Sequence, residues 1–168
     1  MSVPGERTKY RNMIIRRAED KDIESLTKLL EQVLMVHYKL RPDILQAGSR
    51  KYSDEELAAI IANDMTPIFV AEDENKNVVG HCFTRLVDHD ALRDKPHRTL
   101  FIDDLCIDEN ARHMHVGTKL YEYAKDFAVK NKCYNIHLHV WEGNDPARAF
   151  YEAVGMKPYV TGMEEILG

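Results

Sequence analysis

The chain has 168 residues, of which 44% are hydrophobic and 30% are charged, as is typical of one soluble domain. Its formal charge of −5 lacks the basic excess of most nucleic-acid-binding proteins and leaves room for a cationic substrate. No apolar run approaches the length of a membrane span, and the N-terminus lacks the apolar core of a signal peptide. Three cysteines without a CxxC pair indicate neither a disulfide framework nor a zinc ribbon. We therefore expect a single cytoplasmic domain over residues 1–168, with no nucleic acid or membrane as partner.

Two amphipathic helices are predicted near the start of the chain, after a short apolar strand at residues 13–15. Apolar residues recur at spacings of three and four along residues 23–37. Proline disfavours helical backbone in the residue before it, so this helix ends before Pro42. Ser53 and Glu56 have the spacing of a capping box, which predicts the start of a second helix.

The middle of the chain predicts three strands and a helix. Apolar runs at 68–72 and 78–87 flank the polar turn DENKN and indicate a hairpin. A third apolar strand begins at Thr99 and leads through a short polar connection into a helix that begins near Val116. Such a connection directs unpaired backbone N–H groups and the positive end of the helix dipole at one point, which suits a phosphate or pyrophosphate. An ordinary turn without a ligand is the alternative.

The last third of the chain predicts a strand at 135–141 and one more helix. Asp145 as N-cap and Pro146 in the first turn begin this helix, which stops at Gly155. Residues 159–167 can supply a last strand or two. The order of elements predicts the α/β (α+β) class, with a mixed sheet of about six to seven strands flanked by four helices.

Two motifs give this chain a family resemblance. The connection RHMHVG matches the pattern Q/R-x-x-G-x-G/A at Arg112 and Gly117, with His115 in place of its first glycine. The stretch WEGNDPARAFYEAVGM matches a second motif at Asn144, Ala147, Phe150, Tyr151 and Gly155. With these motifs in this order, the chain resembles the GNAT superfamily of acetyl-CoA-dependent N-acetyltransferases. Glycine at position 115 would permit a positive φ, so the histidine puts the shape of the loop in question.

The resemblance implies direct transfer of an acetyl group from acetyl-CoA to an amine. The pantetheine arm would lie along Leu105, Cys106 and Ile107, where two parallel strands separate. The pyrophosphate would lie at the N-terminus of the helix near Val116. The remaining cofactor-binding positions implied by the two motifs are Arg112, His113, Met114, His115, Val116, Gly117, Thr118, Asn144, Ala147 and Phe150.

Tyr151 occupies the position of the superfamily's usual general acid. A departing thiolate needs a proton, and a phenol can donate one. The structural alternative is a tyrosine that packs against the sheet beside Phe150.

Asp103 and Asp104 are candidates for taking the proton from the amine, because an ammonium with a pKa of about 10 must lose a proton before it attacks. In a regular strand they point to opposite faces. Similarity to the spermidine/spermine N-acetyltransferases, which carry an acidic pair here, implies that Asp103 is the base. Histone acetyltransferases have their glutamate where this chain has Phe101, which disfavours that subclass. Alternatively, one Asp pairs with an arginine or caps a loop; Glu142 is the reserve candidate for the base.

Other reactive side chains are assigned no catalytic role. His137 and His139 share a strand face, but no third ligand is placed beside them, so no metal is predicted. Cys106 has no evident activating base for a covalent route. Candidates for lining the acceptor pocket are His37, Tyr38, Tyr52 and Trp141.

We therefore predict an N-acetyltransferase that moves acetyl from acetyl-CoA to a primary amine of a small molecule, with a polyamine or diamine as first choice. A protein N-terminus or a lysine side chain is the alternative acceptor. A non-catalytic acyl-CoA-binding module is the alternative from another functional class. A homodimer is left open.

Overall fold

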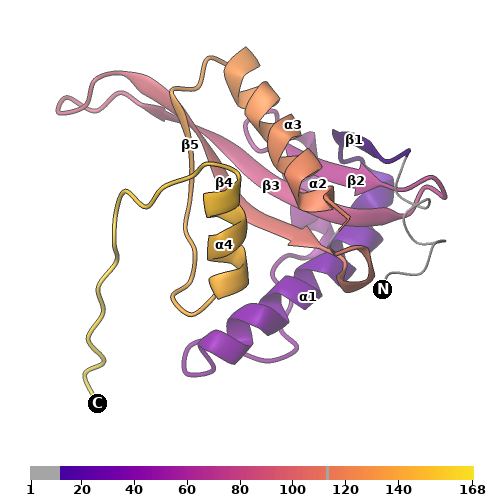
Figure 1. Ribbon diagram of the computed structural model, residues 1–168, viewed down its shortest axis with the longest axis horizontal. Helices are drawn as coiled ribbons and strands as arrows, with labels where there is room; N and C mark the ends of the chain where they lie inside the picture. Colours follow the sequence, from indigo (N-terminus) through magenta and orange to yellow (C-terminus); the bar gives the residue numbers. More distant parts are fainter. Residues whose placement is uncertain (1–11, 113) are drawn as a thin grey trace.

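The computed structural model describes residues 12–112 and 114–168, in which five strands form one sheet with helices on both faces (Figure 1). Neighbouring strands are antiparallel except β4 and β5, which are parallel because helix α3 crosses over between them. The strands follow the order β1 (Ile14–Arg17), β2 (Ile68–Glu72), β3 (Val78–His89), β4 (His97–Ile107) and β5 (Asn135–Leu138).

Four helices accompany the sheet, as predicted, namely α1 (Ile23–Leu40), α2 (Asp54–Ala62), α3 (Val116–Lys130) and α4 (Asp145–Ala153). The capping box at Ser53 and Glu56 opens α2 as expected. Helix α4 begins differently from the prediction, because Asn144 and not Asp145 is its N-cap. The Asn144 side chain accepts a hydrogen bond from the backbone N–H of Ala147, and Asp145 becomes the first helical residue. No helix in the described residues is long and apolar enough to cross a membrane.

Each face of the sheet has its own apolar core. Helices α1 and α2 pack on one face, where Leu26, Leu30 and Leu57 lie in one buried cluster with Phe83 of the sheet. Helix α3 packs on the other face through residues that include Leu120 and Ala124. The two-sided burial explains why β2 is apolar without interruption in four of its five residues, since both of its faces are covered.

The predicted strand or strands after α4 are not formed in the described chain, so the expected six to seven strands become five. Residues 156–168 contain no strand and form a largely exposed tail after α4 (Figure 1). Tyr159 and Val160 are about two thirds exposed, at 66% and 64%. The tail is extended chain, as its apolar pattern indicates, but it pairs with no strand of the described residues.

Candidate active site

The parallel strands β4 and β5 pair over a short distance and then separate. Their last paired residues are Ile102 and Leu138, where β5 ends, whereas β4 continues to Ile107. In the described part of the chain, no strand therefore lies beside β4 from Asp103 to Ile107 on its β5 side. Backbone polar groups along that edge are open to a ligand, as the predicted pantetheine site along Leu105 to Ile107 requires.

The acidic pair lies at an irregularity in β4. Phe83 of β3 is opposite Asp104, and the next residue, Thr84, is opposite Ile102, which leaves Asp103 as an extra residue in β4. This β-bulge breaks the alternation of side chains. The expectation that Asp103 and Asp104 point to opposite faces holds only for a regular strand and is wrong here.

Each carboxylate of the pair has a cationic partner. Arg85 lies two residues after Phe83 on β3, so it shares the face of β3 that α1 and α2 cover. Its Nε donates to both Asp103 oxygens at 3.2 Å. Asp104 is buried and forms an ion pair with Lys51, which precedes α2. Both carboxylates therefore lie on the α1/α2 face of the sheet.

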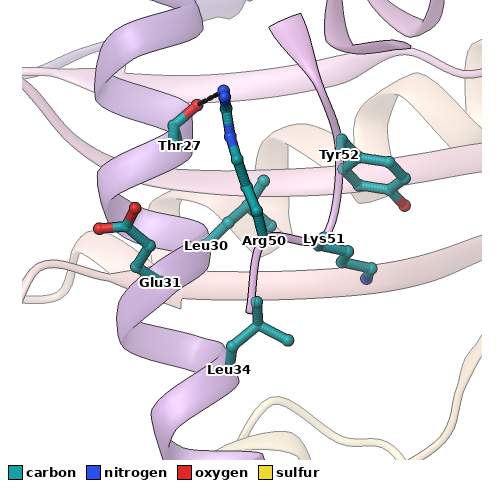
Figure 2. Close-up of a pocket in the computed structure, with 7 residues that line it drawn as sticks. All are labelled: Thr27, Leu30, Glu31, Leu34, Arg50, Lys51 and Tyr52. Carbon is teal, nitrogen blue, oxygen red and sulfur yellow. Dashed lines mark hydrogen bonds between the residues drawn. The ribbon is translucent and has the colours of Figure 1, made fainter. Parts of the chain in front are cut away.

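The loop between α1 and α2 directs Lys51 toward this site (Figure 2). Arg50 points back to α1, where its guanidinium donates to the Thr27 hydroxyl at 3.1 Å, while Lys51 and Tyr52 point away from α1. The loop packs closely on α1, and the hollow between them has no room for a water molecule. It is therefore a packing contact and not a ligand site. Burial lowers the pKa of Lys51, but the charge and hydrogen bond of Asp104 outweigh it and the pKa is raised. Lys51 thus remains an ammonium and is not a base.

The end of α1 meets the loop after β5. The ring of His37 lies 6.2 Å from that of Trp141, and the guanidinium carbon of Arg41 lies 5.8 Å from the Trp141 ring centroid. Burial lowers the pKa of His37 below its usual 6.5, so its imidazole is neutral at neutral pH. Two of the residues assigned to the acceptor pocket are therefore side by side, whereas Tyr52 stacks on Phe83 at 6.0 Å.

The predicted pyrophosphate loop leads directly into α3. Arg112 is exposed after the 3-10 turn Glu109–Ala111, Met114 packs against the core on the α3 face, and Thr118 lies in the first helical turn. His113 lies outside the described residues. His115 is the N-cap of α3 and has φ of 59°, the left-handed conformation that glycine adopts without strain. At residue 115 the backbone therefore has a conformation that the glycine of the motif would permit, even though the glycine is absent.

The two sequence motifs meet at Gly117. A Cβ atom added at this glycine would lie 3.2 Å from the Phe150 ring, closer than ordinary van der Waals contact. Gly117 thus lets Phe150 of α4 pack against the start of α3. Asn144 and Ala147 act on the same helix, because their hydrogen bond caps it.

Tyr151 follows Phe150 on α4 and is half-buried. Burial raises the pKa of its phenol, and the neighbouring Cys82, Asp104 and Tyr121 raise it further. The phenol is therefore protonated at neutral pH, the state in which it can donate a proton.

Comparison with known proteins agrees with this arrangement. A sequence model described as the acetyltransferase (GNAT) family matches residues 33–156, about three quarters of the chain. The chain belongs to the GNAT family. It is accordingly an acetyl-CoA-dependent N-acetyltransferase, as the two motifs implied. A search of curated proteins gave no match.

Solved structures share the fold of this GNAT enzyme. A mutant of the BH1408 protein from Bacillus halodurans is 29% identical, with a TM-score of 0.88 over 92% of this chain and 99% of that one. An aminoglycoside acetyltransferase from an uncultured soil sample, in complex with sisomicin, is 19% identical, with a TM-score of 0.70 over 93% and 97% of the two chains. An aminoglycoside N-acetyltransferase in complex with CoA is 14% identical, with a TM-score of 0.69 over 92% and 94%. The last two show similarity of fold alone.

Cys106, His137 and His139 make contacts that a packing role explains. Burial raises the pKa of the Cys106 thiol to about 12, and the thiol donates to the Leu29 carbonyl oxygen at 3.4 Å, so it is directed toward α1. The stacked rings of His137 and His139 lie 5.9 Å apart, and both flank Phe101. Among the described residues, no group of three or more His, Cys, Asp or Glu side chains could hold a metal ion.

Sequence reasoning missed the two cations that pair with Asp103 and Asp104. Lys51 and Arg85 are 53 and 18 residues away from their carboxylate partners in the chain. Arg85 could have been found as the one Lys or Arg in the apolar run 78–87, which indicates a partner of opposite charge. Lys51 has no such signal, because only the packing of the α1–α2 loop brings it to the sheet.

Proposed function

We propose that this GNAT enzyme acetylates the primary amine of a small molecule. The observation that carries the proposal is the β-bulge, which gathers Asp103 and Asp104 on one face of β4 just beyond the point where β5 separates from it. One carboxylate of this pair is proposed to accept a proton from the amine, and Tyr151 of α4 is proposed to donate one to the thiolate.

The cofactor would bind along the opening between the strands. The pantetheine arm is proposed to pair with the backbone from Leu105 to Ile107. The pyrophosphate is proposed to accept hydrogen bonds from backbone N–H groups at the start of α3, where His115 turns the chain, with charge added by Arg112. These positions suit an anion, because the first N–H groups of a helix have no partner within it.

The reaction follows from these positions. The ammonium loses one proton toward Asp103, whose side chain is 31% exposed and so can pass the proton to solvent. The free amine nitrogen then forms a bond to the acetyl carbonyl carbon, the bond from that carbon to sulfur breaks, and the nitrogen releases its second proton to solvent to become the neutral amide. Tyr151 gives its proton to the departing thiolate and recovers one from solvent. Asp104 is a positioning residue in this scheme, since Lys51 holds it.

The charges of the site bear on the acceptor. Lys51 and Arg85 compensate the two carboxylates, so these four groups carry no net charge. A monoamine carries one positive charge, which it loses before it reacts, so it needs no further carboxylate. A diamine or polyamine keeps a second positive charge, and that charge must share Asp103 with Arg85. We keep a polyamine or diamine as the first acceptor to test and include aminoglycosides, because two structures of similar fold are aminoglycoside acetyltransferases.

The test is thiol release from acetyl-CoA with a panel of monoamines, diamines, polyamines, aminoglycosides and lysine-containing peptides. Release with small amines supports the proposal. Release with peptides alone makes the protein or peptide N-acetyltransferase alternative correct. No release with any acceptor, despite cofactor binding, supports the acyl-CoA-binding module.

Cofactor binding is checked independently of turnover by thermal unfolding with CoA. A ligand that binds only the folded state raises stability by about 2.7 kcal/mol at a hundredfold excess over its dissociation constant. We expect a clear rise in the melting temperature at millimolar CoA. An unchanged melting temperature contradicts the cofactor site.

A further inference from the structure

Lys51 presents a primary amine inside the candidate active site. Its Nζ forms an ion pair with Asp104, whose side chain is only 5% exposed, and its own side chain is 31% exposed. The Nζ atom also lies 5.4 Å from the centroid of the Tyr52 ring. The side chain of Lys28 on α1, by contrast, is 67% exposed. Lys51 therefore carries the same chemical group as the proposed acceptor, but it holds that group at the acidic pair instead of in solvent.

The order of the proposed cofactor contacts places the thioester near this amine. Strand β4 ends at Ile107, and the 3-10 turn Glu109–Ala111 follows it before the start of α3, where the pyrophosphate is proposed to bind. A pantetheine arm that starts there and runs back along β4 reaches Leu105 last. Asp104 is the next residue, so the acetyl end of the cofactor would lie beside the carboxylate that holds Lys51. This step rests on the proposed function.

The loop that carries Lys51 is held in place on both sides of this residue. Arg50, one residue earlier, donates a hydrogen bond of 3.1 Å to α1 (Figure 2). Tyr52, one residue later, stacks on Phe83, which is opposite Asp104 in the sheet. A reacting group that folding has already positioned has a high effective concentration, because the entropy of bringing it to the site is already lost. The amine of Lys51 is therefore positioned for reaction with a bound thioester.

We propose that Lys51 is a modification site, and that the enzyme transfers an acetyl group to its own Lys51 when no acceptor is bound. The ammonium gives one proton to Asp104 along the existing hydrogen bond. Nζ then forms a bond to the acetyl carbonyl carbon, and the bond from that carbon to sulfur breaks. Tyr151 gives its proton to the departing thiolate and recovers one from solvent. Nζ loses its second proton to solvent and becomes a neutral amide, and Asp104 releases its proton to solvent.

The ion pair that positions Lys51 also slows the reaction. Burial lowers the pKa of Lys51, but the charge and hydrogen bond of Asp104 outweigh it and raise the pKa. Little of this amine is therefore neutral at neutral pH, and an acceptor with an ordinary pKa of about 10 should react faster. Self-acetylation is thus a reaction of the enzyme that holds acetyl-CoA without an acceptor, and it occurs once per chain.

Acetylation changes the charge of the site. In the unmodified enzyme, Arg85 and Lys51 balance Asp103 and Asp104. An acetylated Lys51 is neutral, which leaves two carboxylates and one guanidinium. The modified and unmodified enzymes therefore differ in the charge that an incoming ammonium meets.

The first test is mass spectrometry of the full chain before and after incubation with acetyl-CoA alone. We expect the parent protein to gain one acetyl group, and we expect peptide mapping to locate this group at Lys51. Lys51→Arg keeps a cation beside Asp104 but has no primary amine, so it should not gain the group. Acetyl groups on exposed lysines such as Lys28, with Lys51 unmodified, overturn the proposal.

The variant Tyr151→Phe shows whether the active site carries out the reaction. Direct acetylation of an exposed lysine by acetyl-CoA does not use Tyr151, so the rate at Lys28 should be the same in this variant and in the parent protein. The rate at Lys51 should fall by about 10²–10⁴, the usual contribution of a general acid. An equal rate at Lys51 in both proteins contradicts self-acetylation.

The dependence on protein concentration shows whether each chain modifies itself. The rate constant for acetylation of Lys51 should be the same at every protein concentration, because amine and thioester belong to one enzyme–cofactor complex. A rate constant that rises in proportion to protein concentration means that one chain acetylates another, which contradicts the proposal.

The amine panel separates this inference from the proposed function. If small amines are acetylated, but Lys51 stays unmodified when they are left out, the inference is wrong and the proposed function stands. If Lys51 is acetylated and no small amine is, the inference stands and the proposed acceptor is wrong. A cofactor-bound enzyme that acetylates neither contradicts both.

Discussion

The centre of the sheet and the C-terminal part of the molecule are built differently. In β2 and α3, side chains such as Val70 and Leu120 are fully buried. In β5 every residue is only partly buried, and α4 has no buried residue at all. Yet α4 carries Phe150 and Tyr151, two residues of the second family motif.

This difference in burial indicates that the two regions have different roles, one in stability and one in function. Burial of apolar surface supplies most of the stability of a domain, so the core around α3 holds the fold together. Helix α4 and the residues after it pack against that core through the partly buried Phe150, Val154 and Met156, and they contribute less to stability. Regions with few buried contacts open most easily, which suits an element that must admit cofactor and acceptor. Substitutions in the two regions test the division.

Of these substitutions, Tyr151→Phe should have the largest effect, and it should lower turnover without changing stability. Loss of a general acid lowers turnover by about 10²–10⁴, while the ring that packs beside Phe150 remains. We expect little change in CoA affinity and in the melting temperature, measured by titration and by thermal unfolding. If turnover equals that of the parent enzyme, Tyr151 has a packing role and the division is wrong for α4.

A comparison of Leu120→Ala with Val154→Ala tests how much each region contributes to stability. Leu120 is fully buried in α3, and deletion of a buried leucine side chain to alanine costs about 2–5 kcal/mol. Val154, at the end of α4, is only partly buried, so its truncation should cost about 1 kcal/mol or less. Urea unfolding measures both. Equal losses would show that α4 belongs to the cooperative core.

The pH dependence of stability should arise in the central sheet. His81 is fully buried with no hydrogen-bond partner for either ring nitrogen in the described residues, and burial together with Lys51 lowers its pKa from 6.5 to about 3. Below pH 6.5 the unfolded chain binds a proton that the folded chain does not. Stability therefore falls with decreasing pH by about 1.4 kcal/mol per pH unit from this group.

The variant His81→Leu has no imidazole to bind a proton in the unfolded chain. Its free energy of unfolding should therefore depend less on pH between pH 6.5 and pH 5, where the carboxylates remain ionised. His37 and His137 also have lowered pKa values, so a weaker slope of the same sign should remain. Urea unfolding at several pH values measures the difference. An unchanged slope would mean that His81 is protonated in the folded state.

His115→Gly should have the smallest effect. The left-handed conformation strains a residue with a Cβ atom, so glycine should stabilise the folded chain by up to about 1 kcal/mol, less the entropy that it adds to the unfolded chain. CoA affinity should stay within a few-fold, because the loop already has the shape that glycine would give it. A large gain in affinity would instead show that the histidine ring obstructs the pyrophosphate.

The sequence determined the elements whose cause is local. Helical periodicity and the capping box at Ser53 predicted the helices, and the two motifs predicted the family. These features depend on residues a few positions apart, where spacing alone fixes geometry.

Only the tertiary structure decided the features that join distant segments. The bulge at Asp103 depends on the register between β3 and β4, and the pairing of Asp104 with Lys51 depends on how the loop before α2 packs. The residues of the tail favour extended backbone, which is why the sequence predicts a strand there. Whether an extended segment becomes a strand depends on how it packs, and in the described residues this tail forms no backbone pairing with the edge of β5.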